Sequence, residues 1–223
     1  MNSTAIPTVC DATDKATGTD HLSISPSILY FGTPVALLTT ENPDGTPNLA
    51  PVSSAWALGH TVVLGLGAEG HTVANLADRP ELVVSLPSPD LWAAVERLAP
   101  LTGADPVPAA KRGVYRHERD KFAACGLHPH PSEVVGPPRV AECPLQFEAR
   151  VRSIVPAGPD GAFRIVECEV VRVHASASVV VPGTQHIDPG AWSPLIYNFR
   201  HYFGLDGREL GHGFRSETAA SRP

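Results

Sequence analysis

Apolar and β-branched residues recur in short runs along the first ninety positions, and turn residues separate these runs. The run at residues 35–40 is followed by Asn-Pro-Asp-Gly-Thr-Pro, which has the composition of a tight turn leading into a second strand. The same criteria predict strands at residues 61–66 and 82–86, and a short helix at His71–Asp78 that Arg79-Pro80 ends. Strands this close together, with one short helix between them, favour an antiparallel β fold over a doubly wound sheet.

The middle of the chain follows a different pattern. Apolar residues recur at helical spacing over residues 91–98, and Asp90 stands where it could cap that helix. Leu91 and Trp92 are expected to lie in the core. Residues 103–144 are rich in proline, glycine and charge, which predicts a long excursion with one helix near residues 118–125. Excursions of this kind are often lids or binding loops.

The last third returns to strands. Alternation with period two on both sides of a Gly-Pro-Asp-Gly turn at residues 158–161 predicts a long β-hairpin, and an apolar segment at residues 193–205 follows it. The polar residues 1–20 are expected to be a disordered lead-in, and residues 214–223 a disordered tail. One domain is therefore expected over residues 21–213, mainly β with a few short peripheral helices.

Composition and charge narrow the functional classes. The chain has 223 residues, of which 43% are hydrophobic, and its formal net charge is −6. Without a basic excess, binding to nucleic acid through bulk charge is not expected. No apolar run reaches bilayer length and the N-terminus lacks the apolar core of a signal peptide, so a cytoplasmic protein without membrane contact is expected. Four well-separated cysteines are expected to be reduced thiols: Cys10, Cys125, Cys143 and Cys168.

Residues 65–70 read Gly-Leu-Gly-Ala-Glu-Gly, which fits the G-x-G-x-x-G dinucleotide fingerprint between a strand and a helix. The helix is too short for a Rossmann site, and no β-α alternation follows it. A glycine-rich turn at a helix N-terminus still exposes backbone N–H groups to an anion, and His71, Thr72 and Asn75 would then face a phosphate. The alternative is a helix capped by its own first turn.

Two adjacent serines, Ser53 and Ser54, interrupt a strand-like segment beside Trp56. Their hydroxyls either bond the phosphate or polyol chain of a ligand or face water at a sheet edge, and the sequence alone leaves both alternatives open. Trp56 is in turn a candidate to pack on a ligand ring. The segment His128-Pro129-His130 has no nearby cysteine or carboxylate cluster, so it is interpreted as a solvated loop and no metal site is expected.

Several blocks of sequence, taken in order, resemble the flavin reductase-like family. They are TPVALLTTENPDGTPNLAPVSSAWAL, VVLGLGAEGHTVANLADRPELVVSLPSPDLW, DKFAACGL and AECPLQFEARV. The resemblance covers residues 28–202, and its specificity lies in the order and spacing of the blocks rather than in any one of them. It implies the FMN-binding split β-barrel, a mainly β Greek-key fold.

The resemblance also implies a function. Members are homodimers that bind FMN or FAD near the subunit interface, and many use NADH or NADPH to reduce a flavin for a partner monooxygenase. The expected activity is that of an FMN-binding NAD(P)H:flavin oxidoreductase. Residues at the matching positions would line the ring and ribityl chain (Thr39, Thr40, Pro51, Val52, Ser53, Ser54 and Ala55) or the phosphate (Gly67, His71, Thr72 and Asn75).

The phosphate turn departs from the family pattern. Glu69 and His71 stand where basic residues are common, and Thr33 replaces a frequent arginine. A carboxylate at Glu69 would repel a phosphate. A cation would then have to come from elsewhere in the chain, and Lys121 and Arg200 are the candidates.

The C-terminal segment departs as well. His201 lies between Arg200 and Tyr202, which makes it a candidate catalytic acid or base near neutral pH, or else a packed histidine. Two other function classes therefore stay open. One is a split-barrel biosynthetic enzyme or flavin electron carrier that acts on a small organic substrate. The other is a binding domain that has lost flavin.

Overall fold

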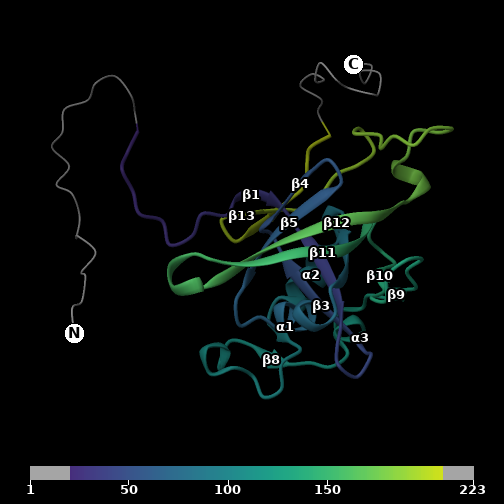
Figure 1. Ribbon diagram of the computed structural model, residues 1–223. Coiled ribbons are helices and arrows are strands. Elements are labelled where there is room, and N and C mark those ends of the chain that lie inside the picture. The colour runs from purple at the N-terminus through teal and green to yellow at the C-terminus, as the bar shows by residue number, and fades with distance from the viewer. Residues whose placement is uncertain (1–20, 208–223) are drawn as a thin grey trace.

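The computed structural model describes residues 21–207, and an antiparallel sheet of seven strands dominates these residues (Figure 1). The strands lie in the order β3-β2-β6-β11-β12-β5-β4, and each neighbouring pair is antiparallel. The expected antiparallel, mainly β fold is thus confirmed. The strand bounds are β2 (Ala36–Glu41), β3 (Pro47–Val52), β4 (Ala55–Leu58), β5 (Thr61–Gly67), β6 (Glu81–Leu86), β11 (Leu145–Ala157) and β12 (Phe163–Ala175).

The two outermost strands of this sheet are consecutive in the chain. Strand β3 ends at Val52 and β4 begins at Ala55, so only Ser53 and Ser54 separate one edge of the sheet from the other. Three residue steps span at most about 10 Å, so the sheet must curl until its two edges nearly meet. The serine pair is therefore the corner at which a barrel closes, and the sheet opens beside it.

Alternation along β2 feeds two separate cores. Ala36 and Leu38 point into the barrel interior, where they pack with residues of β5, β6, β11 and β12. Val35 and Leu37 point the other way, into a second cluster that includes Val95 of α2 (Trp92–Leu98) and residues of α3 (Lys121–Cys125). Period two places successive side chains on opposite faces, so one strand serves both cores.

Helix α1 (His71–Asp78) has the bounds expected from the sequence, and its buried face packs on the barrel interior. The start of α2 differs from the expectation. Pro89 begins a 3₁₀ turn, η1 (Pro89–Leu91), and Asp90 instead accepts a hydrogen bond from Ser88 Oγ. Asp90 therefore does not cap α2, whose N-cap Leu91 offers no side-chain bond, and Trp92 is 52% exposed instead of lying in the core.

A second, three-stranded sheet stands beside the barrel and joins the two ends of the described chain (Figure 1). It contains β1 (Phe31–Pro34), β13 (Ile196–Asn198) and β14 (His201–Phe203), and Thr33 pairs with Tyr197. The β13–β14 turn is made by Phe199 and Arg200, both with positive φ, 43° and 70°. Such a turn matches the twist of the two strands but strains residues other than glycine.

The remaining elements are short. They are β7 (Leu101–Thr102) paired in parallel with β8 (Arg116–His117), β9 (Pro129–His130) paired with β10 (Arg139–Val140), and the 3₁₀ turns η2 (Ala109–Lys111), η3 (Pro159–Gly161) and η4 (Ala177–Val179). His128, next to β9, is exposed and pairs with Glu142. No helix among residues 21–207 has the length and apolar character to cross a membrane.

The cysteines within the described part of the chain are free and buried: Cys125, Cys143 and Cys168. Burial raises the pKa of each thiol, so they are protonated at neutral pH, as expected for reduced core cysteines. Cys10 and the two segments expected to be disordered, residues 1–20 and 214–223, lie outside the described residues.

Candidate flavin site

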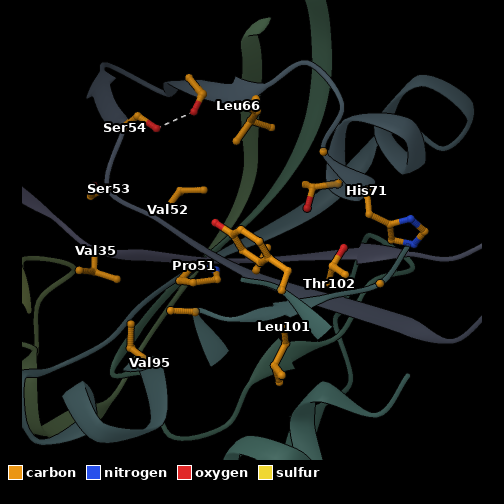
Figure 2. A pocket seen from close by; sticks show the side chains of 18 of the residues that line it. Val35, Pro51, Val52, Ser53, Ser54, Leu66, His71, Val95, Leu101 and Thr102 are labelled. Carbon is orange, nitrogen blue, oxygen red and sulfur yellow. Dashed lines mark hydrogen bonds between the residues drawn. The ribbon is translucent and has the colours of Figure 1, made fainter. Parts of the chain in front are cut away.

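A cavity of about 470 Å³ opens at the seam where the sheet edges approach one another (Figure 2). Its size is in the range of small-molecule sites. Figure 2 shows His71 and Thr102 on one side of the cavity and Val35 on the opposite side. The seam itself supplies the end of β3, the serine link and the end of β5: Ala50, Pro51, Val52, Ser53, Ser54, Gly65, Leu66 and Gly67.

The first turn of α1 forms one end of the cavity. Gly70, His71, Thr72 and Val73 all line it, and no side chain caps the helix. The first bond back to the start of the helix runs from Ala74 N to Gly70 O at 3.2 Å. Gly70 N donates to Gly67 O at 2.9 Å, so the backbone N–H groups without an intrahelical acceptor are those of His71, Thr72 and Val73. These groups and the positive end of the helix dipole favour an anion in the cavity.

Buried polar side chains hold this helix end in position. Asn48 Nδ2 donates to Thr40 Oγ1 at 3.2 Å and to Thr72 Oγ1 at 3.3 Å. Asn75 Nδ2 donates to Thr40 Oγ1 at 3.1 Å and to Asn42 Oδ1 at 3.0 Å. The network joins α1 to strands β2 and β3. Thr40 on β2 and Asn75 on the buried face of α1, which the sequence placed at the flavin, thus hold the helix against the sheet.

Lys121, the first residue of α3, brings a cation to this network although it is 3% exposed. Its Nζ donates to Asn48 Oδ1 at 2.8 Å and to Leu49 O at 2.9 Å, and the side chain lines the cavity. The pKa of Lys121 is lowered to about 8, mainly by burial and in part by the charge of Lys111 on the same wall. The third Nζ proton has no partner among the described residues, so it remains available to a ligand.

His71 is the third basic group at this end. Its Nε2 lies 2.8 Å from Asn42 Oδ1, which also accepts from Asn75, so Nε2 is assigned the proton and Nδ1 the lone pair. Burial lowers the pKa of His71, and the charge of Lys121 lowers it further. Gly103 passes so close that a Cβ there would lie 2.5 Å from His71 Cδ2, so a larger residue would displace the imidazole.

Ser54 ties the seam together. Its Oγ donates to Gly65 O at 2.5 Å, and Gly65 N donates back to Ser54 O at 2.8 Å (Figure 2). With its proton used in this way, the Ser54 hydroxyl offers only lone pairs to a ligand. Ser53 also lines the cavity and makes no hydrogen bond within the described residues. The two serines thus have different roles: Ser54 fixes the corner, and Ser53 is free to donate.

The structure brings together seven of the residues predicted from sequence and leaves five outside the cavity wall. Thr39 points to the face of β2 opposite Thr40, and its buried hydroxyl has no hydrogen-bond partner among residues 21–207. His201 is exposed on β14, away from the wall. The seven are Pro51, Val52, Ser53, Ser54, Gly67, His71 and Thr72, and the five are Thr39, Thr40, Ala55, Asn75 and His201.

The structure also shows where the charged residues of the sequence analysis lie relative to the cavity. Glu69 is exposed and outside the cavity wall. Of the two candidate cations, Lys121 lines the cavity and Arg200 does not. Trp56 is 59% exposed on the outer strand β4 and does not line the cavity either. The acidic departure in the phosphate turn is therefore not part of the site.

Sequence reasoning missed six residues that line the cavity: Tyr30, Thr102, Gly103, Lys111, Tyr115 and Tyr197. These residues lie in segments far apart in the chain, and none belongs to a recognisable motif. The proline-rich excursion gave the only signal, since loops of that length often bind ligands, and it does supply Lys111 and Tyr115.

Comparison with known proteins gives the family. Residues 28–206 match the family model described as "Flavin reductase like domain". The uncharacterized protein YdfE of Bacillus subtilis (strain 168) is 47% identical over 196 residues, which cover 87% of this chain and 94% of that protein.

Solved structures show the same fold at low sequence identity. The flavoredoxin of Desulfovibrio vulgaris (Miyazaki F) superposes with a TM-score of 0.70 at 21% identity, covering 92% of this chain and 100% of that one. Nitrilotriacetate monooxygenase component B from Bacillus cereus gives 0.66 at 22% identity, covering 89% and 100%. A split barrel domain protein from Shewanella frigidimarina NCIMB 400 gives 0.65 at 17% identity, covering 83% and 87%. The mainly β fold is therefore the expected split barrel, and the chain belongs to the flavin reductase-like family.

Proposed function

We propose that the protein is an NAD(P)H:flavin oxidoreductase that binds FMN in the cavity at the barrel seam. The observation that carries this proposal is the end of the cavity where uncapped N–H groups of α1 meet Lys121 and Lys111. Two cations and a helix N-terminus suit a phosphate better than any neutral group. FMN carries such a phosphate, and FAD carries two, so FAD is the alternative flavin.

The rest of the cavity fits the remainder of a flavin. The end of β3 and the link present backbone and the Ser53 hydroxyl, which suit the polar edge of a ring and a polyol chain. A bound flavin supplies an N5 that accepts hydride from the nicotinamide of NAD(P)H. The chain's own residues have only to bind, orient and shield the two rings. A general base is not needed, so the placement of His201 outside the wall is compatible with this chemistry.

Two partners belong to the proposal. An outward-facing apolar strip crosses β4, β12 and β11, and strand register places Trp56, Ile165 and Val155 on one face of the barrel. We propose that a second copy of the chain covers this strip. A measured mass in solution of 23.6 kDa, that of one chain, would contradict the dimer.

The likeness to a monooxygenase component B supports a partner monooxygenase. An assay would detect this partner as hydroxylation that requires both proteins.

A flavin titration tests the proposed site. FMN added to the purified protein is expected to lose fluorescence as it binds with micromolar or tighter affinity. Riboflavin, which lacks the phosphate, is expected to bind at least tenfold more weakly, because a charge-assisted hydrogen bond is worth about 1.5–3 kcal/mol. Equal affinity for the two flavins would show that the cationic end does not hold a phosphate.

A second assay separates the candidate activities. Oxidation of NADH or NADPH that depends on flavin is expected for a flavin reductase, and the faster of the two identifies the nicotinamide. A bound flavin that neither nicotinamide reduces would favour an electron carrier instead. If the protein binds no flavin at all, the remaining candidate is a binding domain that has lost flavin.

We place the activity in the cytoplasm, because Cys125, Cys143 and Cys168 are unpaired.

The pH dependence of FMN binding follows from Lys121. Its pKa is about 8 in the free protein, and only the protonated form attracts an anion. A bound phosphate raises this pKa, so binding takes up a proton above pH 8. FMN affinity is therefore expected to be constant near neutral pH and to fall by up to about tenfold per pH unit above about 8.

The control for this titration is again riboflavin, whose affinity is expected to be flat between about pH 7 and 9 because no phosphate meets Lys121. Below about pH 6 FMN binding weakens for another reason, protonation of its own phosphate. A riboflavin profile that falls in parallel with that of FMN above pH 8 would show that the protein, and not the lysine–phosphate contact, titrates.

A further inference from the structure

All four tyrosines of the chain lie on the wall of this one cavity. Tyr30 precedes β1, Tyr115 belongs to the long excursion, and Tyr197 and Tyr202 lie on β13 and β14. The fold thus collects every phenol of a 223-residue chain from widely separated segments into one site. Tyr197 and Tyr202 also pack, partly buried, against the cluster that contains Val35 and Val95, and each still lines the cavity.

Three of the rings form a continuous aromatic wall. The centroids of Tyr30 and Tyr197 are 5.5 Å apart with an interplanar angle of 52°, and those of Tyr197 and Tyr202 are 5.2 Å apart at 49°. Tyr197 is the centre of the array. Since Tyr197 pairs with Thr33, two residues before Val35, this array of three rings stands on the Val35 side, opposite His71. Tyr115 is not part of the array, and its ring centroid lies 5.7 Å from Lys111 Nζ.

The hydroxyls of this wall are mostly free. Tyr202 donates its proton to Glu96 Oε2 at 2.9 Å, and this bond, after burial, raises the pKa of Tyr202. Within residues 21–207, the hydroxyls of Tyr30, Tyr115 and Tyr197 form no hydrogen bond. Each is a donor directed to solvent or to a ligand. The wall therefore combines ring faces for stacking with unused O–H groups.

We infer that the tyrosine wall is a second binding subsite, for a planar aromatic molecule that carries acceptor oxygens, such as a nitroarene or a quinone. Aromatic rings pack on tyrosine in offset or tilted arrangements at these distances. Ring-borne nitro or carbonyl oxygens accept from the free phenols. The inference rests on the proposed function, which places a flavin in the neighbouring part of the cavity. It adds the class of molecule that would lie beside that flavin.

Binding of a probe without any reductant tests the subsite, because an oxidised flavin cannot reduce the probe. We would use 4-nitrobenzamide, which is planar, uncharged and rich in acceptor oxygens, with FMN-saturated protein and no nicotinamide, and measure its Kd by equilibrium dialysis. Tyr197→Leu removes the central ring and is expected to weaken probe binding by about tenfold or more. Tyr197→Phe keeps the ring and is expected to weaken it by about threefold.

The matched control is Phe203→Leu, which removes an exposed aromatic ring from the neighbouring strand β14 outside the wall. Its affinity for the probe is expected to equal that of the unmodified protein. FMN affinity is expected to change by less than about twofold in the Tyr197 variants, because the phosphate lies at the opposite end. Normal melting curves confirm that each variant is folded.

The outcomes separate the two proposals. The second subsite is wrong if the protein binds FMN but not the probe. It is also wrong if Tyr197→Leu weakens FMN binding and leaves probe binding unchanged, because the tyrosines then hold the flavin itself. If FMN does not bind, the proposed function fails, and the same titration on flavin-free protein decides the subsite alone. Probe binding that depends on Tyr197 then supports the subsite, and its absence overturns it.

Discussion

Lys121→Met is expected to raise the Kd for FMN by roughly 10–100-fold, the largest effect of any single change at the proposed site. The buried ammonium has one free proton on the cavity wall, and a charge-assisted hydrogen bond contributes about 1.5–3 kcal/mol. Methionine keeps most of the volume of the side chain and removes the charge. Fluorescence titration with FMN at pH 7 measures the change.

Two controls make this result specific. The riboflavin affinity of the Lys121→Met variant is expected to stay within about threefold of the unmodified protein, because riboflavin has no phosphate for Lys121 to bind. Lys111 lies at a more exposed position on the same wall, so Lys111→Met is expected to raise the Kd for FMN by only about threefold. The Lys121 variant also leaves Asn48 Oδ1 and Leu49 O without their donor, so its melting temperature must be known. A parallel loss of riboflavin and FMN would indicate a disturbed fold instead of a lost phosphate contact.

Glu148→Ala is expected to lower the free energy of unfolding by about 3–5 kcal/mol. The Glu148 carboxylate is fully buried on β11 and accepts from three backbone N–H groups, those of Glu133 at 2.8 Å, Val134 at 2.7 Å and Val135 at 3.2 Å. It also lies 2.6 Å from His174 Nε2. Alanine leaves these donors buried without an acceptor, and urea unfolding measures the loss.

Glu133→Ala is the matched control. Its side chain is exposed and pairs with Arg172 at 3.2 Å, while its backbone N–H still donates to Glu148. The cost of this change is expected to stay below about 1 kcal/mol. Similar losses in the two variants would mean that the segment before β10 is held by its surface ion pair.

Acid pH provides an independent check on Glu148. Burial alone would raise its pKa, but the hydrogen bonds from the backbone of Glu133 and Val134 and from His174 outweigh burial and lower the pKa below its usual range. A lowered folded-state pKa contributes stability above the unfolded pKa, and this stability is lost as pH falls through the folded value. The Glu148→Ala protein is therefore expected to show a weaker decline of stability in this acid range.

The sequence predicts much of the fold because its local signals are strong. Helix α1 has the expected bounds, since Gly70 precedes it and Arg79-Pro80 ends it. The β11–β12 hairpin follows from period-two alternation around a glycine-rich turn. The Asp90 cap is wrong because Pro89 starts a separate 3₁₀ turn, so α2 begins two residues after Asp90.

The candidate site is less predictable because it depends on sheet order. Nothing local shows that Ser53 and Ser54 join opposite edges of one sheet, which is the reason for their position in a strand-like run. Nor does the sequence show that Lys121 is buried, since a lysine at the start of a helix is ordinarily solvated. Its donation to Asn48 Oδ1 links residues 73 positions apart.

The order of the strands also sets the order in which the molecule can assemble. The hairpins β2–β3 and β4–β5 are adjacent in the chain, but β6, β11 and β12 must enter between them to complete the sheet. Strand β12 ends at Ala175, more than a hundred residues after the serine corner. Pairing across such separations is slow, because the chain between must first be closed into a loop. A nascent chain that has not reached β12 has no barrel seam, so the proposed flavin site can form only after more than three quarters of the polypeptide has been synthesised.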